Sequence, residues 1–206
     1  MSDGMQLMAC VGLLLASALV AGCAQPPTQQ LGAAQQAVEA ARTAGAQDYA
    51  KEDFAKLQQE LALAKDELAK QEKALSIFRS YTDADKMLTR VAETGKEVEA
   101  KAVSTKEAAK TAALTREKEA QTVVASAKEL LAKAPVGKDR AAVESIKQDL
   151  SGLEGSLGAI HQLIEKGDYL GAEAQAEALK DKGVAVSEEI QKAIEKAKGR
   201  KVRAHA

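Results

Sequence analysis

An apolar pattern with a spacing of three and four residues occurs twice in this chain of 206 residues. The first set is Phe54, Leu57, Leu61, Ala64, Leu68, Leu75 and Phe78, with Gln71 at the one polar position. A shift of 89 residues gives the second set, Val143, Ile146, Leu150, Leu153, Leu157, Ile160 and Ile164. Residues at this spacing line one face of an α-helix and form the seam of a coiled coil or bundle. The pattern therefore predicts an all-α protein.

The segments beside each long helix also correspond, which predicts two tandem repeats. The preceding segments match at the same shift of 89: Leu31, Ala34, Val38, Ala41 and Gly45 align with Ala120, Val123, Ala127, Leu130 and Ala134. The following segments match at a shift of 88: Tyr81, Ala84, Leu88, Val91, Gly95 and Val98 align with Tyr169, Ala172, Ala176, Leu179, Gly183 and Val186. Each repeat is expected to form a short helix, a loop and two long helices joined by a tight turn.

Short breaks at 79–80 and 167–168 are expected to be these tight turns. Ser80 with Asp83 three residues later has the pattern of a capping box, and Asp168 is a good N-cap residue. Because short connections make consecutive helices antiparallel neighbours, we expect elongated hairpins within three-helix units. Gly95 and Gly183 lie at seam positions inside helices, where they predict close approach of two backbones.

Residues 82–133 contain one glycine and no proline, so they can form one helix that runs between the repeats. Its middle, 101–121, is almost entirely Ala, Lys, Glu and Thr, which predicts a solvent-exposed segment where the helix can either continue or bend and break. The resulting division is helical repeat 1 at 31–105, helical repeat 2 at 106–198 and a basic tail at 199–206. A single compact bundle of four or five helices is the competing arrangement.

The first 22 residues have the features of a secretory signal peptide, with an apolar core at 7–20 that is too short to span a membrane comfortably. The residues Val20, Ala21, Gly22 and Cys23 resemble the lipobox of bacterial lipoproteins. That resemblance implies cleavage between Gly22 and Cys23 and attachment of lipid, palmitate included, to Cys23. The alternative is an uncleaved apolar helix in which the cysteines have no such role. No Lys or Arg precedes the apolar core.

Residues 23–30 are polar after the cysteine and contain two prolines, which is typical of a flexible tether. Ala24 follows Cys23, and by resemblance to Gram-negative lipoproteins this implies sorting to the outer membrane, with the body on its periplasmic face. Two acyl chains are sufficient for stable anchoring. The membrane is thus an expected partner through Cys23.

The body resembles a family of uncharacterised bacterial envelope lipoproteins with an Ala-rich helical domain, which is often found before OmpA-like modules. The residues that carry this resemblance are 32–46, Tyr49 and the Leu/Ala-rich helix to Lys70, repeated more weakly at 166–172. The resemblance implies a location in the cell envelope and no known biochemical activity.

Few residues suggest chemistry, and we predict no catalytic site, cofactor or metal. The two histidines are His161, expected at the edge of a helix interface, and His205 at the terminus. Glycines at 152, 155 and 158 lack the Lys and Ser/Thr of a phosphate loop, so close helix packing or local flexibility is the expected role. Tyr81 and Tyr169 are expected to cover the ends of the hairpins.

Charge also limits the partners. Asp3 is the one charged residue before Cys23, so the rest of the chain has 29 basic and 29 acidic residues. Such balance argues against nucleic acid. The basic residues of the tail, which are Lys196, Lys198, Arg200, Lys201 and Arg203, can end a helix favourably or contact an anionic partner.

We therefore expect a non-enzymatic, lipid-anchored structural or adaptor protein of the periplasm, with an envelope protein or peptidoglycan as partner. Exposed heptad faces can also form homo-oligomers. The alternative is a ligand-binding or regulatory module for an envelope enzyme or transport complex.

Overall fold

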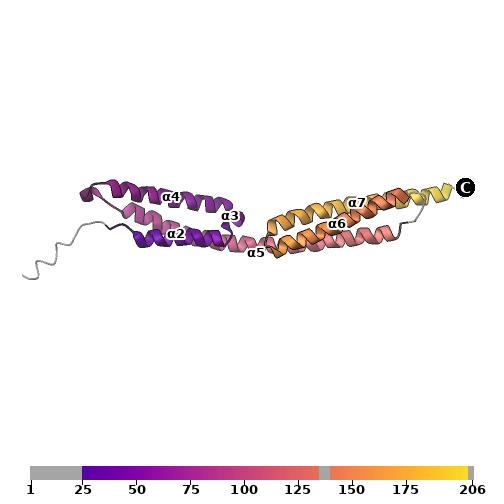
Figure 1. Ribbon diagram of the computed structural model, residues 1–206, viewed down its shortest axis with the longest axis horizontal. Coiled ribbons are helices and arrows are strands. Elements are labelled where there is room, and N and C mark those ends of the chain that lie inside the picture. Colours follow the sequence, from indigo (N-terminus) through magenta and orange to yellow (C-terminus); the bar gives the residue numbers. More distant parts are fainter. Residues whose placement is uncertain (1–24, 135–139, 204–206) are drawn as a thin grey trace, which may run out of the picture. The chain divides into compact units, whose positions relative to one another are not determined.

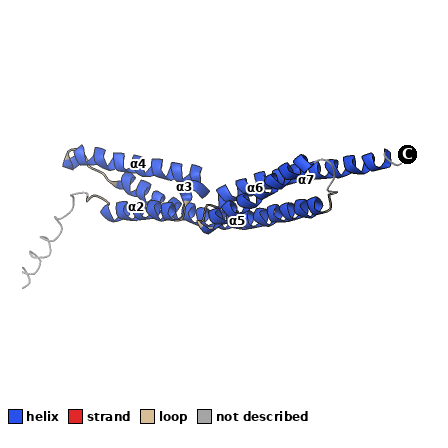
Figure 2. Cartoon of the chain, turned by 45° about the vertical axis from the view of Figure 1, so that its right-hand side comes forward, coloured by secondary structure: helices blue, strands red, loops and turns tan. Residues whose placement is uncertain are grey.

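The computed structural model describes residues 25–134 and 140–203, with side chains described at 25–134 and 143–196. Every regular element in these ranges is helical (Figure 2). The order is α2 (Thr28–Thr43), α3 (Ala46–Tyr49), α4 (Lys51–Lys73), the 3₁₀ helix η1 (Ser76–Phe78), α5 (Thr82–Ala132), α6 (Arg140–Glu165) and α7 (Tyr169–Arg203). The all-α prediction is confirmed. The chain divides into two compact units, residues 1–102 (unit 1) and 103–206 (unit 2).

Unit 1 packs α2, α3, α4 and the first part of α5 around one core (Figure 1). Leu57 of α4 and Leu88 of α5 are fully buried there. The chain turns between α2 and α3 at Gly45, whose φ of 89° is in the left-handed region. Glycine adopts this conformation without the steric cost of a Cβ, and its N–H donates to the carbonyl of Arg42 at 2.9 Å. Gly45 therefore ends α2 and allows α4 to pack back on it.

Two glycines inside long helices mark close approach to another helix. A Cβ on Gly95 of α5 would lie 2.7 Å from the Cβ of Ala37 in α2 and 3.1 Å from its backbone carbonyl carbon. A Cβ on Gly183 of α7 would lie 2.7 Å from Cγ1 of Val123 in α5. Both distances are shorter than non-bonded atoms tolerate, so neither position has room for a side chain. The predicted close approach of two backbones is confirmed at Gly95, whereas the atoms nearest to Gly183 belong to side chains.

Unit 2 packs the second part of α5 with α6 and α7 around a separate core. Ile160 of α6 and Ile190 of α7 are fully buried in it. The turn between α6 and α7 has Gly167 at a φ of 80°. Oδ1 of Asp168 accepts a hydrogen bond from the backbone N–H of Gly171 at 3.0 Å. The prediction that Asp168 caps this helix is therefore confirmed, because its side chain satisfies a free N–H of the first turn.

The connection between α4 and α5 differs from the prediction of a seam through Leu75 and Phe78. The α-helix ends at Lys73, and the side chains of Leu75 and Phe78 are 71% and 73% exposed. The predicted capping box is also wrong, because the N–H of Ser80 donates to Oε1 of Gln71 at 3.0 Å. The spacing of apolar residues continues past Lys73, but in the described part of the chain no helix covers Leu75 or Phe78.

The long helix α5 runs without interruption through 51 residues. The helix therefore does not break at 101–121, and this segment is not uniformly exposed. Ala113 and Ala120 are fully buried and belong to the core of unit 2. A methyl side chain allows neighbouring helices to approach closely, so an Ala-rich segment can be packed without large apolar residues.

Candidate functional site

The predicted lipid-attachment residue Cys23 and the cleavage residue Gly22 lie outside the described residues. The same holds for Cys10 and His205, and for the side chains of Lys198, Arg200, Lys201 and Arg203 in the basic tail. Their assigned roles stay predictions. The described chain begins with a short non-helical segment at 25–27 that leads directly into α2.

The connection from α4 to α5 presents a cluster of exposed apolar side chains, which we call the apolar tip. It consists of Leu75, Ile77 and Phe78, which are 71%, 80% and 73% exposed. Single exposed apolar residues are normal on a protein surface, whereas a contiguous group is typical of an interaction site. No other three large apolar residues in the described part of the chain are as exposed as these.

The apolar tip is held in place by Arg79, whose guanidinium caps the C-terminal end of α4. Its Nε donates to the backbone carbonyl of Gln71 at 3.0 Å. Its Nη2 donates to the carbonyls of Glu72 and Ala74 at 2.9 and 3.0 Å. The last carbonyls of a helix lack partners within the helix, so a cation with several donors satisfies them well. The connection is therefore an ordered loop with its apolar side chains directed away from the core.

Gln71 ties the other side of this loop to α4. Its Oε1 accepts the N–H of Ser80, and its Nε2 donates to Glu67 Oε1 at 2.9 Å. That hydrogen bond, with a smaller contribution from Lys70, lowers the pKa of Glu67. The polar residue in the first apolar set thus has a defined role, which is to bridge α4 and the start of α5.

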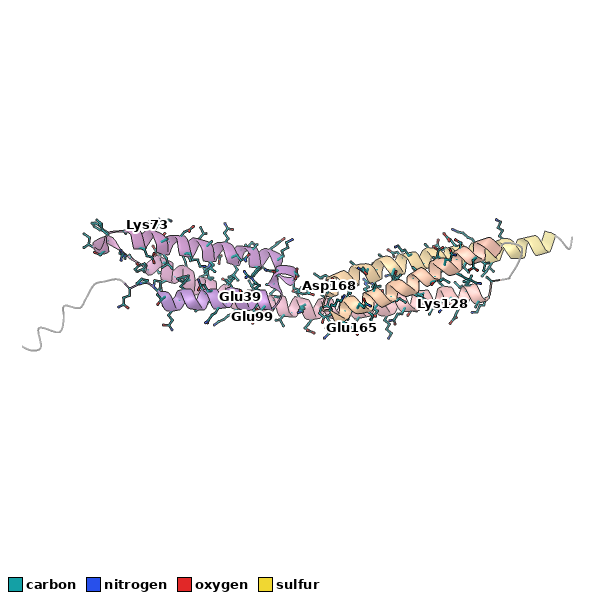
Figure 3. All side chains as sticks on the ribbon, in the orientation of Figure 1. Glu39, Lys73, Glu99, Lys128, Glu165 and Asp168 are labelled. Carbon is teal, nitrogen blue, oxygen red and sulfur yellow. The ribbon has the colours of Figure 1, made fainter. Side chains whose placement is uncertain are left out.

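Replacing Arg79 with Met is expected to lower the free energy of unfolding of unit 1 by about 1–2 kcal/mol, because three carbonyls lose a charged donor. Urea unfolding followed by circular dichroism measures the change. Lys73→Met is the control. Lys73 is exposed at the end of α4, and its replacement removes the same charge as the replacement of Arg79 (Figure 3). An equal loss in both variants would mean that the cap does not stabilise the loop.

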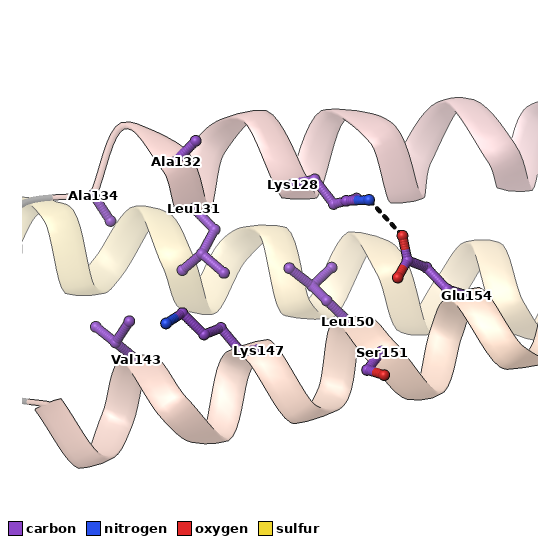
Figure 4. Close-up of a pocket in the computed structure, with 9 residues that line it drawn as sticks. All are labelled: Lys128, Leu131, Ala132, Ala134, Val143, Lys147, Leu150, Ser151 and Glu154. Atoms are coloured by element: carbon purple, nitrogen blue, oxygen red, sulfur yellow. Dashed lines mark hydrogen bonds and ion pairs between the residues drawn. The ribbon is translucent and has the colours of Figure 1, made fainter.

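A second surface feature is a groove between α5 and α6 in unit 2 (Figure 4). Its volume is about 430 Å³, and its lining residues are Lys128, Leu131, Ala132, Ala134, Val143, Lys147, Leu150, Ser151 and Glu154. The amine of Lys128 donates to the carboxylate of Glu154 across the groove. An apolar floor with amines at the rim suits an amphipathic ligand. Among the described lining residues, Glu154 is the one carboxylate, and it is paired with the amine of Lys128.

His161 lies at the edge of the interface between α5 and α6, as predicted. Its Nδ1 is 3.1 Å from Oε1 of Glu117, and its Nε2 is 3.5 Å from Oε1 of Glu165. Glu117 is 8% exposed, whereas the His161 side chain is 61% exposed. The described residues contain no group of His, Cys, Asp and Glu that could hold a metal ion.

Ion pairs between helices define the polar surface of each unit. In unit 2, Arg116 of α5 lies 2.9 Å from Glu119 and 3.2 Å from Glu177 of α7. Lys180 of α7 lies 3.0 Å from Glu177 and 3.4 Å from Glu119. Hydrogen bonds from Arg116 and Lys180 lower the pKa of Glu119, and the bond to Glu177 raises the pKa of Lys180.

Unit 1 has a related pair, in which Lys101 of α5 donates to Asp53 of α4. This hydrogen bond lowers the pKa of Asp53 and raises the pKa of Lys101. In both units, the shifts move the pKa of each of these groups further from pH 7, so each group stays charged at neutral pH. A general acid or base requires the opposite shift, toward the working pH. These ion pairs are therefore suited to fixing helix register rather than to proton transfer.

None of the helices in the described ranges is both long enough and apolar enough to cross a membrane. Comparison with protein-family models, with curated proteins and with solved structures gives no match. Sequence reasoning missed the apolar tip because Leu75 and Phe78 continue the helical spacing, and no Gly or Pro signals the end of α4.

Proposed function

We propose that this protein is a non-enzymatic lipoprotein of the bacterial cell envelope that acts as a structural or adaptor component. The observation that carries the proposal is the apolar stretch that ends in Val20, Ala21, Gly22 and Cys23. Under this proposal, cleavage after Gly22 makes Cys23 the first residue, and lipid on Cys23 holds the protein on the periplasmic face of the outer membrane. Family resemblance of residues 32–46 supports the same location.

The body is proposed to consist of two tandem copies of one three-helix unit. The equivalent glycines support this, because a Cβ added at Gly95 or at Gly183 would lie 2.7 Å from a side-chain atom of an earlier helix of the same unit. Exposed, ion-paired helix surfaces around thin aliphatic cores are suited to contacts with other macromolecules. An envelope protein or peptidoglycan is the proposed partner, with self-association through a helix face as a further mode.

Metabolic labelling with an alkyne analogue of palmitate tests the anchor. In a Gram-negative host, the wild-type chain is expected to be labelled and to fractionate with the outer membrane, whereas Cys23→Ala is expected to lose the label completely. A thioether to the acylated glycerol can form only at a thiol. Cys10→Ala is the matched control and should be labelled like the wild type. Labelling of Cys23→Ala at the wild-type level would contradict the proposal.

The groove between α5 and α6 favours a second candidate function, a ligand-binding or regulatory module. Its apolar lining and two lysines could hold an amphipathic molecule. Cross-linking in intact cells followed by mass spectrometry separates the two functions. A stable protein or peptidoglycan adduct supports the adaptor, and a co-purified small molecule that is lost in Lys147→Glu, at an exposed position of the groove, supports the module.

A further inference from the structure

We propose that the apolar tip inserts into the interface of a phospholipid bilayer, beside the point where the chain itself is anchored. Insertion of Leu75, Ile77 and Phe78 would make unit 1 contact the membrane at two places. The position beside the anchor rests on the proposed lipid attachment at Cys23, whereas binding of the tip to lipid does not.

The first observation is that the apolar tip and the start of α2 lie at the same end of unit 1 (Figure 1). The corner at 44–50 reverses the chain, and α2 packs on α4. Thr28 at the start of α2 is therefore near the end where α4 finishes at Lys73. With 16 and 23 residues, α2 and α4 are about 24 and 34 Å long. The end of α4, from which the apolar tip continues, thus lies about 10 Å beyond Thr28 along the helix axes.

The second observation is the length of chain before α2. Five residue steps separate Cys23 from Thr28, and an extended chain of this length spans at most about 17 Å. This reach exceeds the projection of about 10 Å. Lipid on Cys23 and the apolar tip can therefore enter one membrane surface while α2, α4 and α5 keep their packing. Full extension would release only the bonds from the N–H groups of Thr28 and Leu31 to the carbonyls of Pro26 and Pro27.

The third observation is the charge of the loop. Residues 74–82 contain no carboxylate, and their only charged group, Arg79, donates to the carbonyls at the end of α4. Lys73 beside the loop has an aliphatic stem and an amine that can reach lipid phosphates (Figure 3). Asp83 and Asp85 in the first turn of α5 balance the local charge. Apolar contact with lipid, rather than attraction between charges, is therefore expected to drive binding of the apolar tip to the membrane.

The absence of tryptophan from the sequence allows a direct test. The chain from residue 23 onward, with Cys23→Ser so that it carries no lipid, contains every described helix. Phe78→Trp in this chain is expected to shift its emission to the blue when vesicles of phosphatidylethanolamine and phosphatidylglycerol (3:1) are added. The shift should persist in high salt. Leu63→Trp, at a 50% exposed position on the same unit, is the control and should not shift.

Flotation with the same vesicles measures binding. Ile77→Asp with Phe78→Asp is expected to weaken partitioning about tenfold, because both side chains lose apolar contact with lipid. The control pair Leu63→Asp with Leu114→Asp should bind like the parent. Circular dichroism verifies folding, which these exposed positions leave unchanged.

Two results would overturn the inference. One is unchanged emission of Phe78→Trp with vesicles, and the other is a blue shift that depends on protein concentration without vesicles, which would show a second copy covering the tip. A wild-type chain that takes up no fatty-acid label, or a Cys23→Ala chain that is labelled at the wild-type level, would refute only the anchor at Cys23, provided that the apolar tip still binds vesicles.

Discussion

Replacing Leu57 with Ala is expected to lower the free energy of unfolding of unit 1 by about 2–5 kcal/mol. Leu57 is fully buried on α4, and its side chain belongs to the core that joins α2, α4 and α5. Truncation removes buried methyl groups and leaves a cavity. Many neighbours in this core are alanines, whose methyl groups have no rotamers with which to fill the space. The loss should therefore be in the upper part of this range.

Leu63→Ala provides the matched control, because Leu63 lies on the same helix with half of its side chain exposed. Its effect is expected to stay within about 0.5 kcal/mol. Urea unfolding gives the free energies. Hydrogen exchange read by mass spectrometry locates the loss, which should appear in α2, α4 and the first part of α5 while α6 keeps its protection. Equal effects of the two substitutions would contradict the packing of α4 described above.

Gly95→Ala and Gly155→Ala are expected to have opposite effects, although both replace a helical glycine with the same residue. Gly95→Ala should destabilise unit 1 by about 1–2 kcal/mol, since the new methyl would overlap Ala37 and its backbone. Gly155→Ala should stabilise unit 2 by about 0.5–1 kcal/mol. Apart from the adjacent backbone of its own helix, no described atom lies within 4 Å of a Cβ at Gly155, so the gain in helix propensity is the expected effect.

Thermal and urea unfolding of both variants measure these changes. Gly183→Ala should fall between them, because the group it meets is a methyl of Val123, which can move more easily than the backbone of Ala37. Stabilisation by Gly95→Ala as large as that by Gly155→Ala would mean that α2 and α5 do not pack closely.

The sequence alone is sufficient for the helical class because apolar spacing reports directly which face of a helix is buried. Phe54, Leu57 and Leu68 are buried as their spacing predicts. Leu75 and Phe78 have the same spacing and are exposed. The spacing of apolar residues identifies the buried face of a helix only as far as the helix continues. It does not show where that helix ends, or whether a neighbouring helix extends far enough to cover its last residues.

The two turns show why one helix end could be predicted and the other could not. At Gly167 and Asp168, glycine and an N-cap residue are local signals that need no information from elsewhere. At the end of α4, the cap is the side chain of Arg79, which reaches back to the carbonyl of Gln71 eight residues earlier. A contact of this kind depends on the folded loop, so the apolar tip became visible only in three dimensions.

The proposed lipid-attachment site at Cys23 is the opposite case, because it is predicted from the sequence and the fold gives no information about it. Its assignment comes from the small residues before the cysteine and the apolar core before them, which are features of a linear signal. The helices that follow supply no independent information about it. The role of Cys23, the location at the outer membrane and the absence of enzymatic activity therefore stay predictions, which the labelling and vesicle experiments address.

The composition of the two cores has a consequence for the response of the protein to temperature. Alanine provides 14 of the 29 buried apolar residues in the described part of the chain. The heat capacity change of unfolding arises mainly from newly exposed apolar surface, and alanine contributes little of it. Unfolding should therefore have a smaller heat capacity change per residue than an average domain. A flatter stability curve follows, so the helical body would keep similar stability across a wide range of growth temperatures.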